Sequence, residues 1–290
     1  MQPRPVASIL TCFLLASCTA KRVASSNDVR TGNETAAHEP LVIGDSFTID
    51  STILGEVRRI NVFVPTVYGE KFDVALPVLY MPDGGLDEDF LHIAGLIQVL
   101  VSDGSMRPFI LLGIQNTQRR RDMTGPTQSP DDKKIAPVVG GSAAFRRFIK
   151  EELMPAVRAR YRTTEEIAIV GESLAGLFVV ETYFLDPELF GTYIAIDPSL
   201  WWNNDEIPRL ADERLKLPPS GRKVIFLASS DEPRIAGVTA QVAASFEAHR
   251  SGNIDFHYSP LPAEHHNTIY HPAALLAFRT VFAPAPQPKK

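Results

Sequence analysis

The stretch Gly171-Glu172-Ser173-Leu174-Ala175-Gly176 decides which fold this sequence predicts. An apolar run at 167–170 before it predicts a β-strand, and a second apolar run from Leu177 predicts a helix. A serine at such a sharp turn from strand to helix has a strained backbone and needs small neighbours. The pattern therefore predicts a nucleophile elbow, which exposes the Ser173 hydroxyl above the sheet and aims the first helix amides at an oxyanion.

Ala175 stands where the usual elbow pattern, Gly-x-Ser-x-Gly, has its last glycine. A methyl group is the smallest possible departure, so the elbow remains the favoured interpretation. The alternative is that Ser173 only caps the helix that follows it. The two interpretations differ downstream, because only an elbow needs an acid and a histidine later in the chain.

Short apolar runs along the chain predict strands, and the segments between them predict helices. The first two strands are expected to be antiparallel and the middle ones parallel, because unbroken apolar runs are typical of strands covered on both faces. Strands are expected at 47–51, 59–65, 78–81, 109–114, 167–170, 193–196, 224–228 and 254–259. Helices are expected at 89–101, 142–159 with Ser142 as its cap, 177–184, 236–250 and 272–282. This alternation predicts an α/β-hydrolase fold, with a sheet of about eight mostly parallel strands and helices on both faces.

Carboxylates and histidines follow the last two predicted strands, where this fold places the partners of its serine. The strand before the last is followed by Asp231 and Glu232, and the last strand by His265 and His266, with His271 farther on. From the residues alone, either carboxylate could be the acid that partners Ser173, and any of these histidines could be the base. The paired histidines could instead bind a metal, but no carboxylate-rich group of further ligands is evident, so no metal and no cofactor is expected.

The N-terminal residues predict export and a lipid anchor in a membrane. An apolar stretch from about Val6 to Ala16 is too short to span a bilayer and runs into Leu-Ala-Ser-Cys18. This ending is similar to a bacterial lipoprotein box, in which the cysteine becomes the lipidated first residue of the mature chain. Thr19 in place of an aspartate favours the outer membrane, so the expected location is the periplasm or cell envelope. The alternative is an ordinary signal peptide, cleaved without lipidation.

The predicted organisation is a signal peptide at 1–17, a flexible tether at 18–40, one α/β-hydrolase domain at 41–283 and a disordered proline-rich tail at 284–290. Because Cys12 and Cys18 are the only cysteines, the mature chain can form no internal disulfide. A formal charge of −5 and the lack of a long basic run argue against a nucleic-acid partner. The sequence makes no prediction of the oligomeric state.

Taken together, the motifs resemble the branch of the α/β hydrolases that holds esterase D and the siderophore trilactone esterases, along with mycolyltransferases and feruloyl-type carbohydrate esterases. The resemblance spans roughly residues 45–282. It rests on the elbow with Leu177-Phe178, on Asp186–Phe190, on Ile196–Trp202 and on Glu264–Thr268. The segments Ser199–Trp202 and Arg119–Asp122 are closest to the siderophore esterases.

The resemblance implies a serine carboxylic ester hydrolase that works through an acyl-enzyme on Ser173. It implies that His266, rather than His265, is the general base. It favours Glu232 as the acid that orients the base, with Asp231 as the alternative. The oxyanion donors that it implies are the backbone N–H of Leu174 and the loop after the third strand, at Gly84 and Gly85.

Arginine and tryptophan residues near the same edge of the sheet are the predicted substrate contacts. Arg119 and Arg121 suggest a clamp for an anionic group, while the alternative is a solvated loop with one arginine paired to Asp122. Of Trp201 and Trp202, one is expected to line a pocket for a ring and the other to pack as cap or core.

The expected substrates are small molecules, either siderophore-like lactones or other aromatic or acyl esters. An acyltransferase or a feruloyl or acetyl carbohydrate esterase would use the same residues. A surface-anchored binding protein without catalysis is the alternative from another class, and Ala175 with the uncertain acid is its best support.

Overall fold

The computed structural model describes residues 39–285 apart from positions 68 and 218. The predicted signal peptide, the lipid box at Cys18, nearly all of the tether and residues 286–290 of the predicted tail lie outside the described residues. Within the described part of the chain, no helix has the length and apolar character that crossing a bilayer requires.

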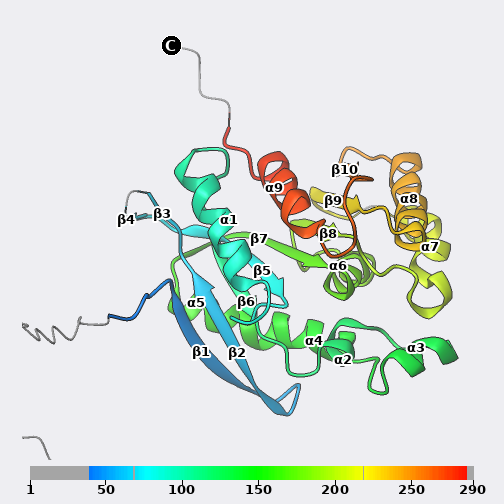
Figure 1. Cartoon of the computed structure of the whole chain (residues 1–290), viewed down its shortest axis with the longest axis horizontal. Helices are drawn as coiled ribbons and strands as arrows, with labels where there is room; N and C mark the ends of the chain where they lie inside the picture. The colour runs from blue at the N-terminus through cyan, green and yellow to red at the C-terminus, as the bar shows by residue number, and fades with distance from the viewer. Residues whose placement is uncertain (1–38, 68, 218, 286–290) are drawn as a thin grey trace, which may run out of the picture. The chain divides into compact units, whose positions relative to one another are not determined.

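Among the described residues, eight strands form one sheet in the order β1-β2-β6-β5-β7-β8-β9-β10 (Figure 1). β1 pairs with β2 and β2 with β6 in antiparallel register, while the remaining pairs are parallel. The strands are β1 (Asp45–Ser51), β2 (Glu56–Phe63), β5 (Leu76–Pro82), β6 (Ile110–Ile114), β7 (Thr163–Glu172), β8 (Thr192–Ile196), β9 (Lys223–Ser229) and β10 (Ile254–Pro260). All eight predicted strands are therefore confirmed, together with the α/β-hydrolase class of fold.

A small hairpin of β3 (Thr66–Val67) and β4 (Glu70–Lys71) lies beside the sheet and was not predicted. Strands of two residues are too short to give a periodic signal in the sequence.

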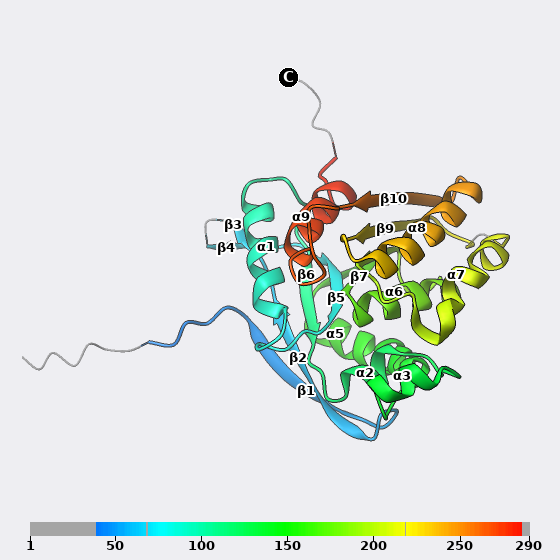
Figure 2. The ribbon, with the colours of Figure 1, turned by 45° about the vertical axis from the view of Figure 1, so that its right-hand side comes forward.

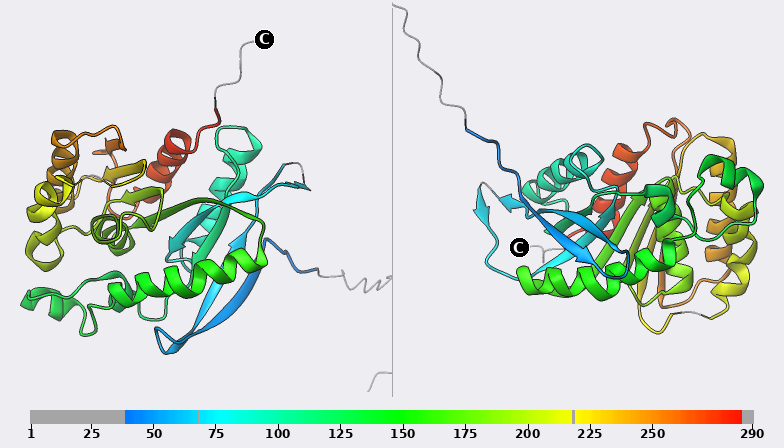
Figure 3. Two further views of the ribbon diagram at one scale, coloured as in Figure 1. Left: turned by 180° about the vertical axis from the view of Figure 1, so that it is seen from behind. Right: turned by 90° about the horizontal axis from the view of Figure 1, so that it is seen from below.

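Helices cover both faces of the sheet (Figures 2 and 3). One face packs against the buried sides of α1 (Phe90–Ser102) and α9 (Tyr270–Val281). The opposite face packs against α4 (Ser142–Phe148), α5 (Met154–Arg160), α6 (Leu174–Leu185) and α8 (Pro233–Ala248). The central strands β5, β6 and β8 are buried along their whole length and, apart from Thr192, consist of apolar and aromatic residues, as the unbroken runs predicted.

The predicted helix at 142–159 is present as α4, a π-helical turn (Ile149–Leu153) and α5 in direct succession. The prediction that Ser142 caps this helix is wrong. Ser142 is already the first helical residue, the cap position belongs to Gly141, and no side chain accepts a capping hydrogen bond there.

Three helices near the carboxyl edge of the sheet were not predicted: α2 (Arg119–Met123), α3 (Pro130–Ile135) and α7 (Trp202–Leu215). α2 and α3 are too short and too polar for an amphipathic pattern. α7 contains Pro208 and begins with three residues of positive φ, Asn203 to Asp205, so its sequence lacks a continuous helical signal.

Candidate active site

Ser173 occupies the turn between β7 and α6 with a backbone φ of 58° and ψ of −117°. The backbone of any residue other than glycine is strained at such a positive φ. The elbow geometry predicted from the sequence is therefore present. Gly171 is required there, because a Cβ on it would lie 2.5 Å from the carbonyl carbon of Ala175. The methyl group of Ala175 is itself fully buried, so the departure from the usual pattern is accommodated in the turn.

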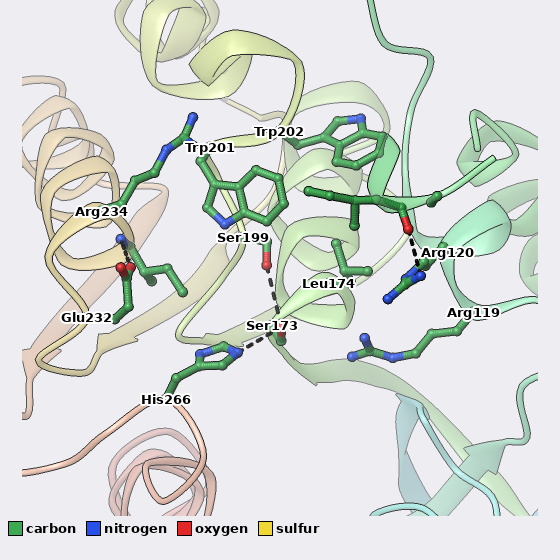
Figure 4. A pocket seen from close by; sticks show the side chains of 13 residues that line it. Arg119, Arg120, Ser173, Leu174, Ser199, Trp201, Trp202, Glu232, Arg234 and His266 are labelled. Carbon is green, nitrogen blue, oxygen red and sulfur yellow. Dashed lines mark hydrogen bonds between the residues drawn. The ribbon is translucent and has the colours of Figure 1, made fainter. Parts of the chain in front are cut away.

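His266 contacts the serine (Figure 4) and, through its other ring nitrogen, a buried carboxylate. Its Nε2 lies 3.2 Å from the Oγ of Ser173, and its Nδ1 lies 2.6 Å from Oδ2 of Asp197. The tautomer that suits both contacts carries its hydrogen on Nδ1 and accepts the serine hydroxyl at Nε2. The hydrogen bond to Asp197 raises the pKa of His266, although partial burial of the ring opposes this.

Asp197 stands directly after β8 and is fully buried. Its Oδ1 accepts the backbone N–H of Ser230 at 2.6 Å, and its Oδ2 accepts the Ser230 hydroxyl at 2.8 Å. Since a buried carboxylate needs hydrogen-bond donors, these contacts and His266 account for its burial. The backbone φ of Asp197 is 46°, a second strained residue at the same edge of the sheet.

The prediction that Glu232 or Asp231 binds the catalytic histidine is wrong in this geometry. Glu232 turns into α8, where its Oε2 accepts the backbone N–H of Ile235 at 2.7 Å and caps the helix. Asp231 binds the exposed Nδ1 of His265 at 2.7 Å instead. Asp197 was missed although it met the same rule, an acid after a strand that lies between the serine and the histidine in chain order.

The two predicted oxyanion donors in the loop after β5 are already engaged. The N–H of Gly84 donates to the carbonyl of Ile114 at 3.0 Å, and the N–H of Gly85 donates to the carboxylate of Glu88 at 2.6 Å. Gly84 is needed for close packing, because a Cβ on it would lie 2.2 Å from the Cα of Gly113. The geometry therefore does not support Gly84 and Gly85 as oxyanion donors.

Leu174 and Arg119 line the same pocket as Ser173 and remain as donors to an oxyanion. Leu174 is the first residue of α6, where backbone N–H groups lack partners within the helix. Arg119 uses Nε and Nη2 to bind Asp83, at 2.7 and 2.8 Å, which leaves Nη1 outside this ion pair. The guanidinium group of Arg119 points toward Ser173 in Figure 4.

The arginine-rich segment 119–122 divides between the pocket and the protein interior. The prediction that Arg121 contacts substrate is wrong, because Arg121 binds Glu56 and Asp122 and does not line the pocket. Asp122 in turn binds the fully buried Arg58 at 2.5 Å. Of the alternative interpretation, the pairing of an arginine with Asp122 is present, but the segment is a helix with Asp122 buried rather than a solvated loop. The ion pair of Asp122 with Arg58 fastens α2 to β2.

The pocket beside Ser173 has a volume of about 370 Å³ and an aromatic and cationic lining. Both Trp201 and Trp202 line it; Trp202 is nearly buried, and its indole N–H donates to the carbonyl of Gly125 at 3.0 Å. The guanidinium of Arg234 lies 5.4 Å from the ring centre of Trp201, within range of a cation–π contact. Arg120 and Glu232 also line the pocket, and Nη1 of Arg120 donates to a backbone carbonyl rather than to a carboxylate.

Arg120 and Arg234 were not named among the predicted substrate contacts. Arg234 lies on α8, far from the arginine-rich segment in the sequence, and no local pattern marks it. Within the described residues, no three His, Cys, Asp or Glu side chains gather as metal ligands would.

The chain order of serine, aspartate and histidine, each at the carboxyl end of a strand, is that of the α/β hydrolases, enzymes that attack a carbonyl group with an activated serine. Comparison with protein families refines this class. The model of the family described as "Putative esterase" matches residues 51–275, so the chain belongs to that family and is an ester-hydrolysing enzyme.

Individual relatives agree with this assignment. The ferri-bacillibactin esterase BesA of Bacillus subtilis is 29% identical over 60% of this chain and 67% of its own. The siderophore triacetylfusarinine C esterase of Aspergillus fumigatus is 40% identical over 57% of this chain and 59% of its own. Among solved structures, an IroE-like serine hydrolase from Shewanella oneidensis superposes with a TM-score of 0.74 at 28% identity, over 82% of this chain and 80% of that one.

Proposed function

We propose that this protein is a serine esterase that cleaves siderophore-like lactones through an acyl-enzyme on Ser173. The observation that carries the proposal is the position of His266, between the Ser173 hydroxyl and the buried Asp197, at the floor of an aromatic and cationic pocket. Two of the relatives are esterases of the siderophores bacillibactin and triacetylfusarinine C, which supports siderophore-like esters as the class of substrate.

The reaction follows from the roles that the geometry allows. His266 Nε2 takes the Ser173 proton while the serine oxygen attacks the ester carbonyl, and Asp197 stabilises the imidazolium that forms. The backbone N–H of Leu174 and the Arg119 guanidinium bind the resulting oxyanion. Each such donor contributes about 3 kcal/mol to the stability of the transition state. His266 then gives the proton to the leaving alcohol, and water hydrolyses the acyl-enzyme by the same sequence of steps.

The pocket lining favours substrates that are aromatic and anionic. Trp201 offers a ring face for stacking, and the charges of Arg120 and Arg234 lie on the wall around it. Asp83 largely balances the charge of Arg119, and Asp205, 3.6 Å from Arg234, partly balances that of Arg234. Arg120 binds only a neutral carbonyl and is the cation left to meet an anionic group. A lactone that carries catecholate groups fits this chemistry better than a neutral aliphatic ester.

The test is hydrolysis of a ferric catecholate trilactone by the purified chain, with linear products separated and identified by mass. We expect linear products from the active chain and none above background from a chain inactivated by a phosphonate at the serine. Arg120→Gln is expected to raise KM for this anionic substrate about tenfold, the effect of ~1.4 kcal/mol, and to change p-nitrophenyl acetate hydrolysis little. Equal turnover by active and inactivated chains would contradict the proposal.

We also propose that a lipid on Cys18 anchors the enzyme in the cell envelope on its periplasmic side. The apolar stretch that ends in Leu-Ala-Ser-Cys18 supports this proposal. In a bacterial host fed an alkyne-tagged fatty acid, we expect the full chain to become labelled and to fractionate with membranes. Cys18→Ala is expected to lose both properties, and label retained by that variant would show that the lipid is attached elsewhere.

A further inference from the structure

Glu172, the last residue of β7, places its carboxylate beside the catalytic histidine. Its Oε1 lies 3.5 Å from His266 Nε2, the same ring nitrogen that faces the Ser173 hydroxyl at 3.2 Å. Asp197 occupies the other ring nitrogen. Since the side chain of Glu172 is only 16% exposed, its charge is poorly solvated. The base of the reaction therefore lies between two carboxyl groups, and only Asp197 was accounted for by the mechanism.

The charged groups around this pair do not balance Glu172. On the side of Glu172, Arg119 is its other cationic neighbour and is already bound by Asp83 through two hydrogen bonds. Asp83 also adds negative charge of its own, as does the buried Asp197. Tyr270 lies within electrostatic range of Glu172 and Asp83.

The remaining charges act from the neighbouring elements. Asp89, at the start of α1, lies near Asp83 and faces Tyr270 with it. On the side of His266, Glu232 at the start of α8 adds a weaker negative field.

Burial and these neighbours raise the pKa values of both Glu172 and His266. Burial raises the pKa of Glu172 to about 8, against the attraction of His266 and Arg119. The hydrogen bond that His266 donates to Asp197 and the field of Glu172 raise the pKa of His266. Because Glu172 and His266 lie 3.5 Å apart and each changes the pKa of the other, they titrate as a coupled pair.

We propose that Glu172 is a positioning residue that shares one proton with His266 and so sets the pH at which the base is free. While the proton lies on His266 Nε2, the histidine cannot accept the Ser173 hydroxyl. While it lies on Glu172, the histidine is neutral and can act. Over a catalytic cycle the proton from Ser173 passes to His266 and then to the leaving alcohol, and the proton content of Glu172 is unchanged. This inference rests on the proposed function of Ser173 and His266.

The first test is the pH dependence of kcat/KM for p-nitrophenyl acetate, a neutral substrate, in the full chain and in Glu172→Gln. The Glu172 carboxylate stabilises protonated His266. In the parent, the acid limb of the kcat/KM profile therefore lies at higher pH than it would without this carboxylate. Removing that carboxylate should move the limb to lower pH by about one pH unit. If Glu172 only packs, activity falls by the same factor at every pH and the limb stays in place, which overturns the proposal.

Asp231→Asn is the matched control, because it removes a carboxylate that binds the neighbouring His265 rather than His266. We expect its acid limb to coincide with that of the parent. Should Glu172→Gln fail to fold, Glu172→Asp withdraws the carboxylate by one methylene and should shift the limb by a smaller amount in the same direction. A limb that does not move in a folded Glu172→Asp chain counts against the proposal.

A second measurement does not depend on turnover. The imidazole resonances of His266 can be titrated by NMR in the Ser173→Ala chain, with Glu172 and with Glu172→Gln. We expect the apparent pKa of His266 to fall when the carboxylate is removed. Equal titration curves overturn the shared proton even if esterase activity is established. A shift in a chain whose parent hydrolyses no ester supports the shared proton and contradicts the proposed function.

Discussion

Replacing Asp197 with asparagine is expected to lower kcat for ester hydrolysis about 10⁴-fold while the protein stays folded. Asparagine can keep its oxygen on the backbone N–H of Ser230, but it turns an N–H toward His266 Nδ1. The imidazole must then carry its hydrogen on Nε2, where it can no longer accept the proton of Ser173. Steady-state kinetics with p-nitrophenyl acetate measures the loss, and circular dichroism checks the fold.

Two matched variants test the assignment of this acid. Glu232→Gln and Asp231→Asn remove the carboxylates that the sequence favoured, and we expect each to keep kcat within about tenfold of the parent, because neither carboxylate binds His266. Ser173→Ala marks complete loss, about 10⁶-fold. If Glu232→Gln lost more activity than Asp197→Asn, the acid would have to be reassigned to the start of α8.

Removing the carboxylate of Asp122 is expected to lower the free energy of unfolding by about 3–5 kcal/mol. Arg58, its partner at 2.5 Å, is fully buried, and the side chain of Asp122 is only 1% exposed. Asp122→Ala leaves the Arg58 charge inside the protein with Glu56 as its remaining ion-pair partner. Urea unfolding followed by tryptophan fluorescence measures the change.

Asp131→Ala provides the control, because Asp131 pairs with Lys134 on the surface, where both side chains are mostly exposed. We expect that variant to change stability by less than about 1 kcal/mol. A loss in Asp122→Ala no larger than in the control would show that water or a rearranged side chain reaches Arg58. Replacing Arg58 and Asp122 together by Met and Leu is expected to recover stability, because no unpaired charge is then buried.

The sheet could be predicted from the sequence because its physical cause is local. Strands buried on both faces must be apolar throughout, and runs such as Ile110–Ile114 show this directly. The helices at the carboxyl edge could not be predicted in the same way. α2 is five residues of mostly charged side chains, and it is held by Arg58 from a strand more than fifty positions earlier, which no local pattern reveals.

The serine was predictable because it stands alone in the elbow, whereas His266 could be told from its neighbour His265 only through the resemblance to the family. The acid was not predictable, because β8 and β9 both end in carboxylates at the same edge, and only the structure shows which one faces His266. One signal was available: Pro233 follows Glu232, and an acidic residue before a proline is typical of a helix cap. The spacing of the arginines does not show which of them contacts the pocket. Arg121 is drawn into the interior because it shares Glu56 and Asp122 with the buried Arg58.

The ion pairs behind α2 have a consequence for how this enzyme could change. Ser173, Asp197 and His266 are supported by the sheet, whereas Arg119, Arg120 and Ile135 are carried on the segment between β6 and α4. That segment is fastened at one end by the contacts of Arg58 and Arg121. The triad and part of the pocket wall thus have separate supports, so substitutions at Arg120 and Ile135 can change which ester is bound while Ser173, Asp197 and His266 stay in place.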